Sequence, residues 1–297
     1  MMQFITPVLV ALLISLHASA QADYYVEDTL ELDTVGSSEA DHSIIAVNSF
    51  GDVIIVNHTT VGSHSKAVEV NILAPLGSSL ADGFKLFNTE LLGHPNIQVF
   101  GVGNDTCIKP DAEALGDGTF LAVWSRHDLS GTRTSQIEAC KIITRDSSGN
   151  LLPQIQIIAP QPGDGVIIDN TAIPGEAGFM PDIAAFHNSG STSAFVVFAH
   201  EDGMLRGSTN TFRDYSLIAK RIDWPRGSSS PSILSATTIE TDIPFDNQNS
   251  MPYSGGMVLP DAVLDDGGNL TVVYESYLIA PHNWHFGPAI GSIQLRR

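Results

Sequence analysis

Four imperfect copies of one strand pattern recur along this chain, and this repeat constrains the fold more than any other feature of the sequence. The clearest copy, Pro110–Ala159, contains four short strand-like runs separated by turns such as Gly116-Asp117-Gly118. One of these runs, Phe120–Trp124, has the apolar and aromatic residues that a half-buried strand prefers. Four consecutive antiparallel strands in meander order form one blade of a β-propeller. The repeat therefore predicts a propeller.

The four copies span residues 41–91, 110–159, 181–240 and 260–297. The second strand of each copy ends at Asn57, Trp124, Phe198 and Tyr274, so these ends lie 67, 74 and 76 residues apart. Common propeller repeats have about 40–50 residues. The extra residues lie in the loop after the second strand and in the approach to the first strand. Both connections emerge at the same end of an antiparallel blade, so this end is the predicted functional face.

Ring closure is predicted from the two ends of the chain. The fourth copy reaches Arg297 after its third strand, whereas Tyr24–Val35 alternates apolar and polar residues without a partner nearby in the sequence. Such alternation is a strand signal, and pairing this strand with the last blade would remove an open edge. We therefore expect an all-β propeller of four blades, each with four antiparallel strands, closed by the N-terminal strand. The alternative is that the chain is a piece of a larger propeller.

The N-terminus and the charge indicate an exported protein. Met1–Ala20 has an apolar run followed by Ala18-Ser19-Ala20, as in a secretory signal peptide, which leaves 21–297 as a single domain. No later stretch is apolar enough to span a membrane. The 33 acidic residues outnumber 14 basic ones, a net charge of −19 that argues against binding nucleic acid or anionic membranes. The chain is expected to be secreted, periplasmic or extracellular and to be a monomer. Its acidity suits cationic partners, metal ions or simply a self-repelling surface.

The second and fourth copies resemble repeats of large secreted bacterial propeller proteins. The residues that carry this resemblance are Pro110, Ala114, Leu115, Asp117, Gly118, Phe120, Val123, Trp124, Asp146, Gly149, Asn150, Pro260, Asp266, Gly267, Leu270, Val273 and Tyr274. The first copy departs from the pattern, with Ser43 and Ile44 in place of Pro-Asp. The resemblance implies a structural or binding role and brings no catalytic residues. The Asp-box pattern of sialidases is absent.

An aspartate stands at the start of the predicted innermost strand in three copies, at Asp111, Asp182 and Asp261. These strand starts converge on the channel of a propeller, where clustered carboxylates could hold a hard cation such as Ca²⁺. The alternative is structural, because an aspartate in a Pro-Asp turn can accept hydrogen bonds from nearby backbone N–H groups.

The loops after the second strands carry groups that can bind ligands or transfer protons. The candidate ligand-binding residues are His127, Asp128, His200, Glu201, Asp202, Glu275, His282, Trp284 and His285. Pairs of acids could serve glycoside hydrolysis, and an exposed tryptophan could stack on a sugar ring. None of the metalloprotease, serine-hydrolase, phosphate-loop or EF-hand motifs occurs.

The chain has two cysteines, Cys107 and Cys140, which an oxidising compartment could join in a disulfide. In the predicted blade, however, they lie on the first and third strands with one strand between them, which makes the geometry doubtful.

Taken together, the sequence predicts a secreted propeller that binds a glycan or an extracellular protein through its long-loop face. The alternative is a glycoside-active enzyme, a hydrolase or lyase, that uses acidic residues on that face. A third possibility is a structural surface module without a small-molecule ligand.

Overall fold

A computed structural model describes residues 41–61, 65–77, 82–88, 90–93, 105–128, 136–160, 165–170, 179–206, 211–240, 257–278 and 290–296. Every described residue belongs to one compact unit within Ser38–Arg297. The predicted signal peptide and the predicted closing strand Tyr24–Val35 lie outside the described residues. Within these ranges, no helix is long and apolar enough to cross a membrane.

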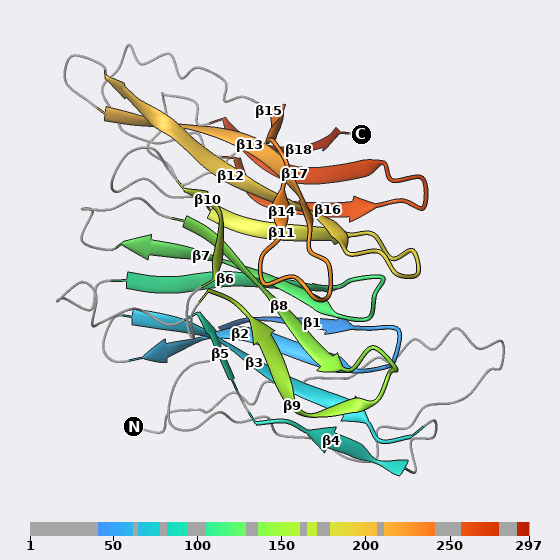
Figure 1. Cartoon of the computed structure of the whole chain (residues 1–297). Helices are drawn as coiled ribbons and strands as arrows, with labels where there is room; N and C mark the ends of the chain where they lie inside the picture. The colour runs from blue at the N-terminus through green and yellow to red at the C-terminus, as the bar shows by residue number, and fades with distance from the viewer. Residues whose placement is uncertain are drawn as a thin grey trace. The chain divides into compact units, whose positions relative to one another are not determined.

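The described chain is all-β and forms four antiparallel sheets that follow one another in sequence (Figure 1). Sheet 1 contains β1 (Asp41–Val47), β2 (Val53–Val61), β3 (Ser65–Pro75), β4 (Phe84–Leu86) and β5 (Glu90–Gly93). Sheet 2 contains β6 (Asp105–Ala114), β7 (Phe120–Asp128), β8 (Gln136–Arg145), β9 (Leu151–Ile158) and β10 (Val166–Asn170). Sheet 3 contains β11 (Phe179–Ala185), β12 (Ser193–Arg206), β13 (Thr211–Asp223), β14 (Ser232–Ile233) and β15 (Thr237–Glu240). Sheet 4 contains β16 (Met257–Leu264), β17 (Leu270–Leu278) and β18 (Ile290–Arg296).

The outer edge of the first three sheets differs from the predicted single fourth strand. In each of them, two short strands pair with different parts of the long third strand: β4 and β5 with β3, β9 and β10 with β8, and β14 and β15 with β13. The third strands have 11, 10 and 13 residues, so each is long enough for two short strands to pair with it one after the other along its length. The predicted strand over Phe84–Leu91 is therefore divided into β4 and β5.

The first and second strands pair in an equivalent register in all four sheets. Val56, Val123, Val197 and Val273 occupy the same position on the second strands, opposite Ile44, Asp111, Asp182 and Asp261. Directly before each of these four partners, the ladder of the first strand is irregular. Three of the irregularities contain a proline, which cannot donate a ladder hydrogen bond and is therefore found at bulges and edges. The Pro-Asp pair is thus the residue signature of this bulge.

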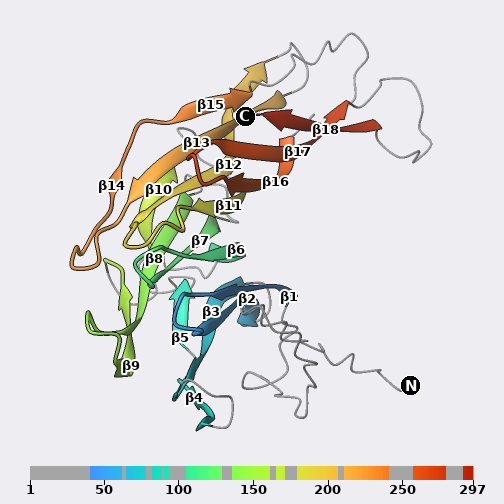
Figure 2. The same ribbon diagram turned by 90° about the vertical axis from the view of Figure 1, so that its right-hand side faces the viewer.

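Each sheet packs face to face on the next one, and the first strands β1, β6, β11 and β16 contact each other in that order (Figures 1 and 2). Alternation along β7 sends Trp124 toward sheet 1 and Val123 toward sheet 3, because successive side chains point to opposite faces of a strand. Three apolar cores result: one between sheets 1 and 2, one between sheets 2 and 3, and one between sheets 3 and 4.

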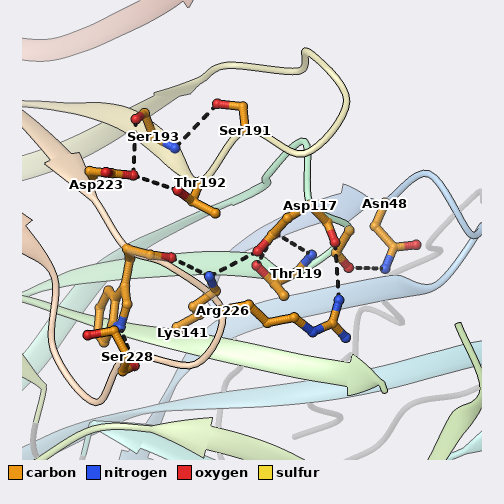
Figure 3. A network of polar contacts seen from close by, with 12 residues as sticks. Asn48, Asp117, Thr119, Lys141, Ser191, Thr192, Ser193, Asp223, Arg226 and Ser228 are labelled. Atoms are coloured by element: carbon orange, nitrogen blue, oxygen red, sulfur yellow. Dashed lines mark hydrogen bonds and ion pairs between the residues drawn. The ribbon is translucent and has the colours of Figure 1, made fainter. Parts of the chain in front are cut away.

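Buried polar contacts also join the sheets, at the end where the first and second strands are connected by tight turns. Asp52 of sheet 1 accepts hydrogen bonds from Arg145 Nη2 at 2.6 Å and Thr144 Oγ1 at 2.7 Å of sheet 2. Lys141 of sheet 2 donates to Asp117 at 3.1 Å and to the carbonyl of Trp224 in sheet 3 (Figure 3). These contacts bind neighbouring sheets to each other in fixed register.

Candidate functional site

In sheets 1, 2 and 3, the second and third strands continue into the segments predicted as long loops, so these connections are shorter than the sequence predicts. His127 and Asp128 lie on β7, His200, Glu201 and Asp202 on β12, and Glu275 on β17. In sheet 3 the predicted loop is a β-hairpin whose ladder continues to the pair Arg206 and Thr211. His282, Trp284 and His285 lie outside the described residues. Long runs of polar residues hid these strand extensions from sequence analysis.

The described histidines of this region are held between sheets. His127 is buried, and desolvation lowers its pKa to about 4, so its imidazole is neutral at pH 7. His200 Nδ1 lies 2.7 Å from Asp169 Oδ2 on β10 of the preceding sheet. Lys220 Nζ lies 2.5 Å from the other oxygen of Asp169. Burial raises the pKa of Asp169, but the hydrogen bonds from His200 and Lys220 and the charge of Lys220 outweigh it, so the net shift is downward.

A second polar cluster lies at the same end of sheet 2. Glu138 accepts hydrogen bonds from the indole of Trp124 at 3.0 Å and from the backbone of Gly165 at 3.2 Å. Its other oxygen lies 2.8 Å from Arg126 Nε. Glu138 and Asp169 were not among the candidate residues predicted from the sequence. The one signal that could have identified them is an acidic residue within a mostly apolar strand, β8 for Glu138 and β10 for Asp169. Because both carboxylates are fully engaged by cations and N–H groups, they serve the packing of the sheets.

The three repeated aspartates lie within the first strands and not at the strand starts as predicted, and Asp111 and Asp182 link one sheet to the next. Asp111 accepts a hydrogen bond from Ile183 N of sheet 3 at 2.7 Å. Asp182 accepts one from Ala262 N of sheet 4 at 2.6 Å. The structural alternative expected donors from the local Pro-Asp turn, whereas Ile183 and Ala262 belong to the following sheet; Asp111 also accepts from Ala112, the residue directly after it. Asp261 is exposed.

These carboxyl groups also influence each other's protonation. Desolvation raises the pKa of Asp182 to about 8, and the charges of Asp111, Asp261 and Glu113 add to this effect. Desolvation likewise raises the pKa of Asp111 to about 6, although hydrogen bonds from Ile183 and Ala112 and from Asp182 oppose the shift. Two neighbouring carboxyl groups that cannot both ionise share a proton. The Asp111–Asp182 pair therefore retains a proton near neutral pH.

Glu113 and His187 border this carboxyl pair. Glu113 follows Asp111 by two residues on β6, so both side chains leave the strand on one face. His187 Nε2 lies 3.3 Å from Glu113 Oε1, and this hydrogen bond raises the pKa of His187. Neither residue was selected from the sequence, because nothing in the local pattern places them beside Asp182 of another repeat.

The predicted calcium site gains no support. The described side chains form no group of three or more His, Cys, Asp or Glu residues that could hold a metal ion. Two of the three proposed ligands already accept backbone hydrogen bonds.

The predicted disulfide is not formed: within β6 and β8, Cys107 and Cys140 are buried and are not joined to each other. Cys107 pairs with Arg126 of β7, whereas Cys140 pairs with Ala122 of the same strand. The two cysteines are thus separated by β7 and by four residues along it. Strand spacing and rise place them about 10 Å apart across the sheet and about 14 Å apart along it, which is too far for a disulfide.

Comparison with known proteins gives weak structural similarities. The chain matches an endo-1,5-alpha-L-arabinanase from Thermotoga petrophila with 13% identity and a TM-score of 0.42, over 86% of this chain and 56% of the other. A glycosyl hydrolase from Bacteroides ovatus matches with 9% identity and a TM-score of 0.41, over 86% and 66% of the two chains. An alpha-L-arabinanase from Cellvibrio cellulosa, complexed with arabinohexaose, matches with 12% identity and a TM-score of 0.36, over 86% and 77%.

This chain spans little more than half the length of the first of these structures. No protein-family model and no curated protein matches the sequence. The similarities are too distant to assign the fold family or the activity.

Proposed function

We propose that this protein is a glycoside-active enzyme whose acid–base groups lie on the first strands of its sheets. The proposal rests on the Asp111–Asp182 pair: the two carboxyl groups lie on the first strands of neighbouring sheets, within hydrogen-bond reach of each other, and burial raises the pKa of both. A carboxylic acid that stays protonated at the working pH is what a glycoside hydrolase needs to protonate the leaving oxygen. This assignment replaces the hairpin end as the reacting site, because Glu138 and Asp169 each pair with a cation that keeps the carboxylate ionised. The partners of Asp182, the backbone N–H of Ala262 and the carboxyl of Asp111, allow it to hold a proton.

Two roles follow from the placement of these groups. Asp182 is the proton donor, because its pKa of about 8 keeps it protonated at pH 7. Glu113 is the candidate base that activates water. It lies two residues along β6 from Asp111 on the same face of the strand, and its charge helps to raise the pKa of Asp182.

The architecture proposed for this enzyme is a propeller in which each described sheet is one blade. Repeated face-to-face sheets with their first strands in mutual contact support this interpretation. The predicted leader Met1–Ala20 supports export, so the proposed substrate is an extracellular neutral glycan.

Hydrolysis assays with a panel of neutral polysaccharides, beginning with linear arabinan, test the proposal. Asp182→Asn removes the proton donor and should lower kcat about 10²–10⁴-fold. Glu113→Gln should lower it similarly, and Glu90→Gln, at an exposed acid of β5, should leave it unchanged. Wild-type levels of hydrolysis in Asp182→Asn would remove this residue from the reaction.

A binding module is the second candidate, and the hairpin of β12 and β13 favours it. Its ladder runs from Ser193 and Asp223 to Arg206 and Thr211, which offers a regular β-surface to a glycan or protein. Retention of the protein on a glycan array without any turnover, in wild type and Asp182→Asn alike, would support this function over the enzymatic one.

A further inference from the structure

The side of sheet 4 that faces away from sheet 3 has the composition of a packing surface. We call the face of a sheet that is turned toward the next sheet in sequence its following face, and the opposite face its preceding face. At each described junction, the following face of one sheet packs on the preceding face of the next. On the following faces of sheets 2 and 3, Leu121, Val123 and Val197 are buried. The equivalent residues of sheet 4, Thr271 and Val273, are half-buried, and Val263 beside them is 60% exposed.

Sheet 1 has the complementary surface on its first strand. Ile45 and Val47 of β1 are each 43% exposed on the preceding face. Their equivalents in the next two sheets, Ala112 and Ala114 and then Ile183 and Ala185, are buried against the sheet before them. Val53 and Ile55 of β2 are buried on this face, so its exposed apolar part lies on β1.

The aspartate contacts between sheets run in the same direction, with the acceptor on one sheet and the N–H donor on the next sheet in sequence. Asp111 binds the N–H of Ile183, and Asp182 binds the N–H of Ala262. Asp261 continues this series on sheet 4, where it is exposed. The matching donor position on sheet 1 is Ile45, which pairs with Ile55 as Ile183 pairs with Val196. Sheet 4 therefore offers the acceptor half of the contact and sheet 1 offers the donor half.

We propose that a second copy of this chain docks on sheet 4 through its β1 strand. Asp261 of one copy accepts the N–H of Ile45 of the other, and Val263 packs on Ile45 and Val47. Sheets 1 and 4 of one chain are separated by three junctions and do not pack on each other among the described strands, so a second copy is the partner that brings the two faces together. The contact is heterologous, and two such contacts close a ring of two copies.

The mass of the purified chain in solution tests this contact. Size-exclusion chromatography with light scattering should give twice the 31.7 kDa of one chain. Because each copy carries a net charge of −19, raising the salt to about 0.5 M should increase the dimer fraction by screening repulsion.

Substitutions on each face identify the surfaces. Val263→Asp and Ile45→Asp should each shift the protein to a monomer with an unchanged circular dichroism spectrum. An equimolar mixture of the two variants should recover dimer, since each contributes one intact face. Leu234→Asp, at an exposed residue between β14 and β15, should stay dimeric.

Three results would overturn the proposal. The first is that the wild type is a monomer at both salt concentrations, whether or not Val263→Asp lowers the melting temperature of that monomer. The second is a dimer that Val263→Asp dissociates but Ile45→Asp does not, which indicates sheet 4 packing on sheet 4. The third is dissociation by Leu234→Asp to the same extent.

Discussion

At the residue scale, the proline and the aspartate of the Pro-Asp pair have two different structural roles. The proline occupies a bulge where no ladder donor is needed, and the aspartate that follows reaches the backbone of the next sheet. The pair recurs in three copies because it occupies the equivalent position on the first strands β6, β11 and β16. The first copy has Ile44 at this position, and there the N–H of Ala112 in sheet 2 is bound by Asp111 itself.

The raised pKa values of Asp111 and Asp182 predict a pH-dependent stability. Between about pH 6.5 and pH 8, Asp182 stays protonated in the folded chain but not in the unfolded chain, so the free energy of unfolding should fall as pH rises. His187, whose pKa is also raised, acts in the same direction. Below about pH 6.5, His127 opposes this trend, because its imidazole binds a proton in the unfolded chain and stays neutral in the folded chain down to about pH 4. Thermal melts between pH 6.5 and pH 9 should show the decline, with about 2–4 °C lost per kcal/mol.

Asp182→Asn should flatten the dependence, because the amide is neutral at every pH. Glu90→Gln, far from the pair in sequence and exposed, should keep the wild-type slope. A melting temperature that rises over this range in the wild type would contradict the proton-sharing pair.

The cysteines give a second prediction at this scale. Thiol titration of the denatured, unreduced chain should find two thiols, and the native protein should react slowly because both sulfurs are buried. Burial also raises the pKa of the Cys140 thiol, which removes the reactive thiolate. A count of zero thiols would show that the disulfide forms after all.

At the element scale, the tight turn after β6 decides how sheet 2 meets sheet 3. Gly116 accepts a hydrogen bond from Gly190 N at 2.8 Å, and Asp117 N donates to Ser191 O at 2.9 Å. A Cβ atom on Gly116 would lie 1.9 Å from the carbonyl oxygen of Asn188. Gly116→Ala should therefore lower the free energy of unfolding by about 1–3 kcal/mol in urea denaturation.

Gly227→Ala is the matched control for that measurement. A Cβ atom there meets no heavy atom within 4 Å, and the residue has no positive φ, so the free energy of unfolding should change little. Equal effects of the two substitutions would show that the close approach of the turns is not what Gly116 serves.

The strands themselves were largely predictable, because local alternation and turn residues encode them. The positions Asn57, Trp124, Phe198 and Tyr274, aligned from the sequence, are equivalent in the observed register. Strand ends were less predictable: β12 continues through His200, Glu201 and Asp202, where cross-strand pairing with β13 outweighs the polar composition. Contacts between sheets, such as Asp169 with His200, join residues from different repeats and leave no local signal.

At the scale of the whole molecule, charge opposes compaction. The 33 acidic residues face only 14 basic ones, and several of the described cations, among them Lys141 and Arg145, are already used in contacts between sheets. The remaining acids repel one another over distances that salt screens, since the Debye length falls from about 30 Å at 0.01 M to about 8 Å at 0.15 M.

Added salt should therefore stabilise the fold. We expect the melting temperature to rise by about 2–4 °C, equivalent to roughly 1 kcal/mol, when NaCl increases from 0.01 M to 0.3 M at pH 7. Sulfate at equal ionic strength serves as a check, because screening depends on ionic strength, whereas any further rise in sulfate reports preferential exclusion. A melting temperature that falls with NaCl would contradict this expectation. It would mean that salt weakens ion pairs such as Asp52–Arg145 by more than it relieves the repulsion among the excess carboxylates.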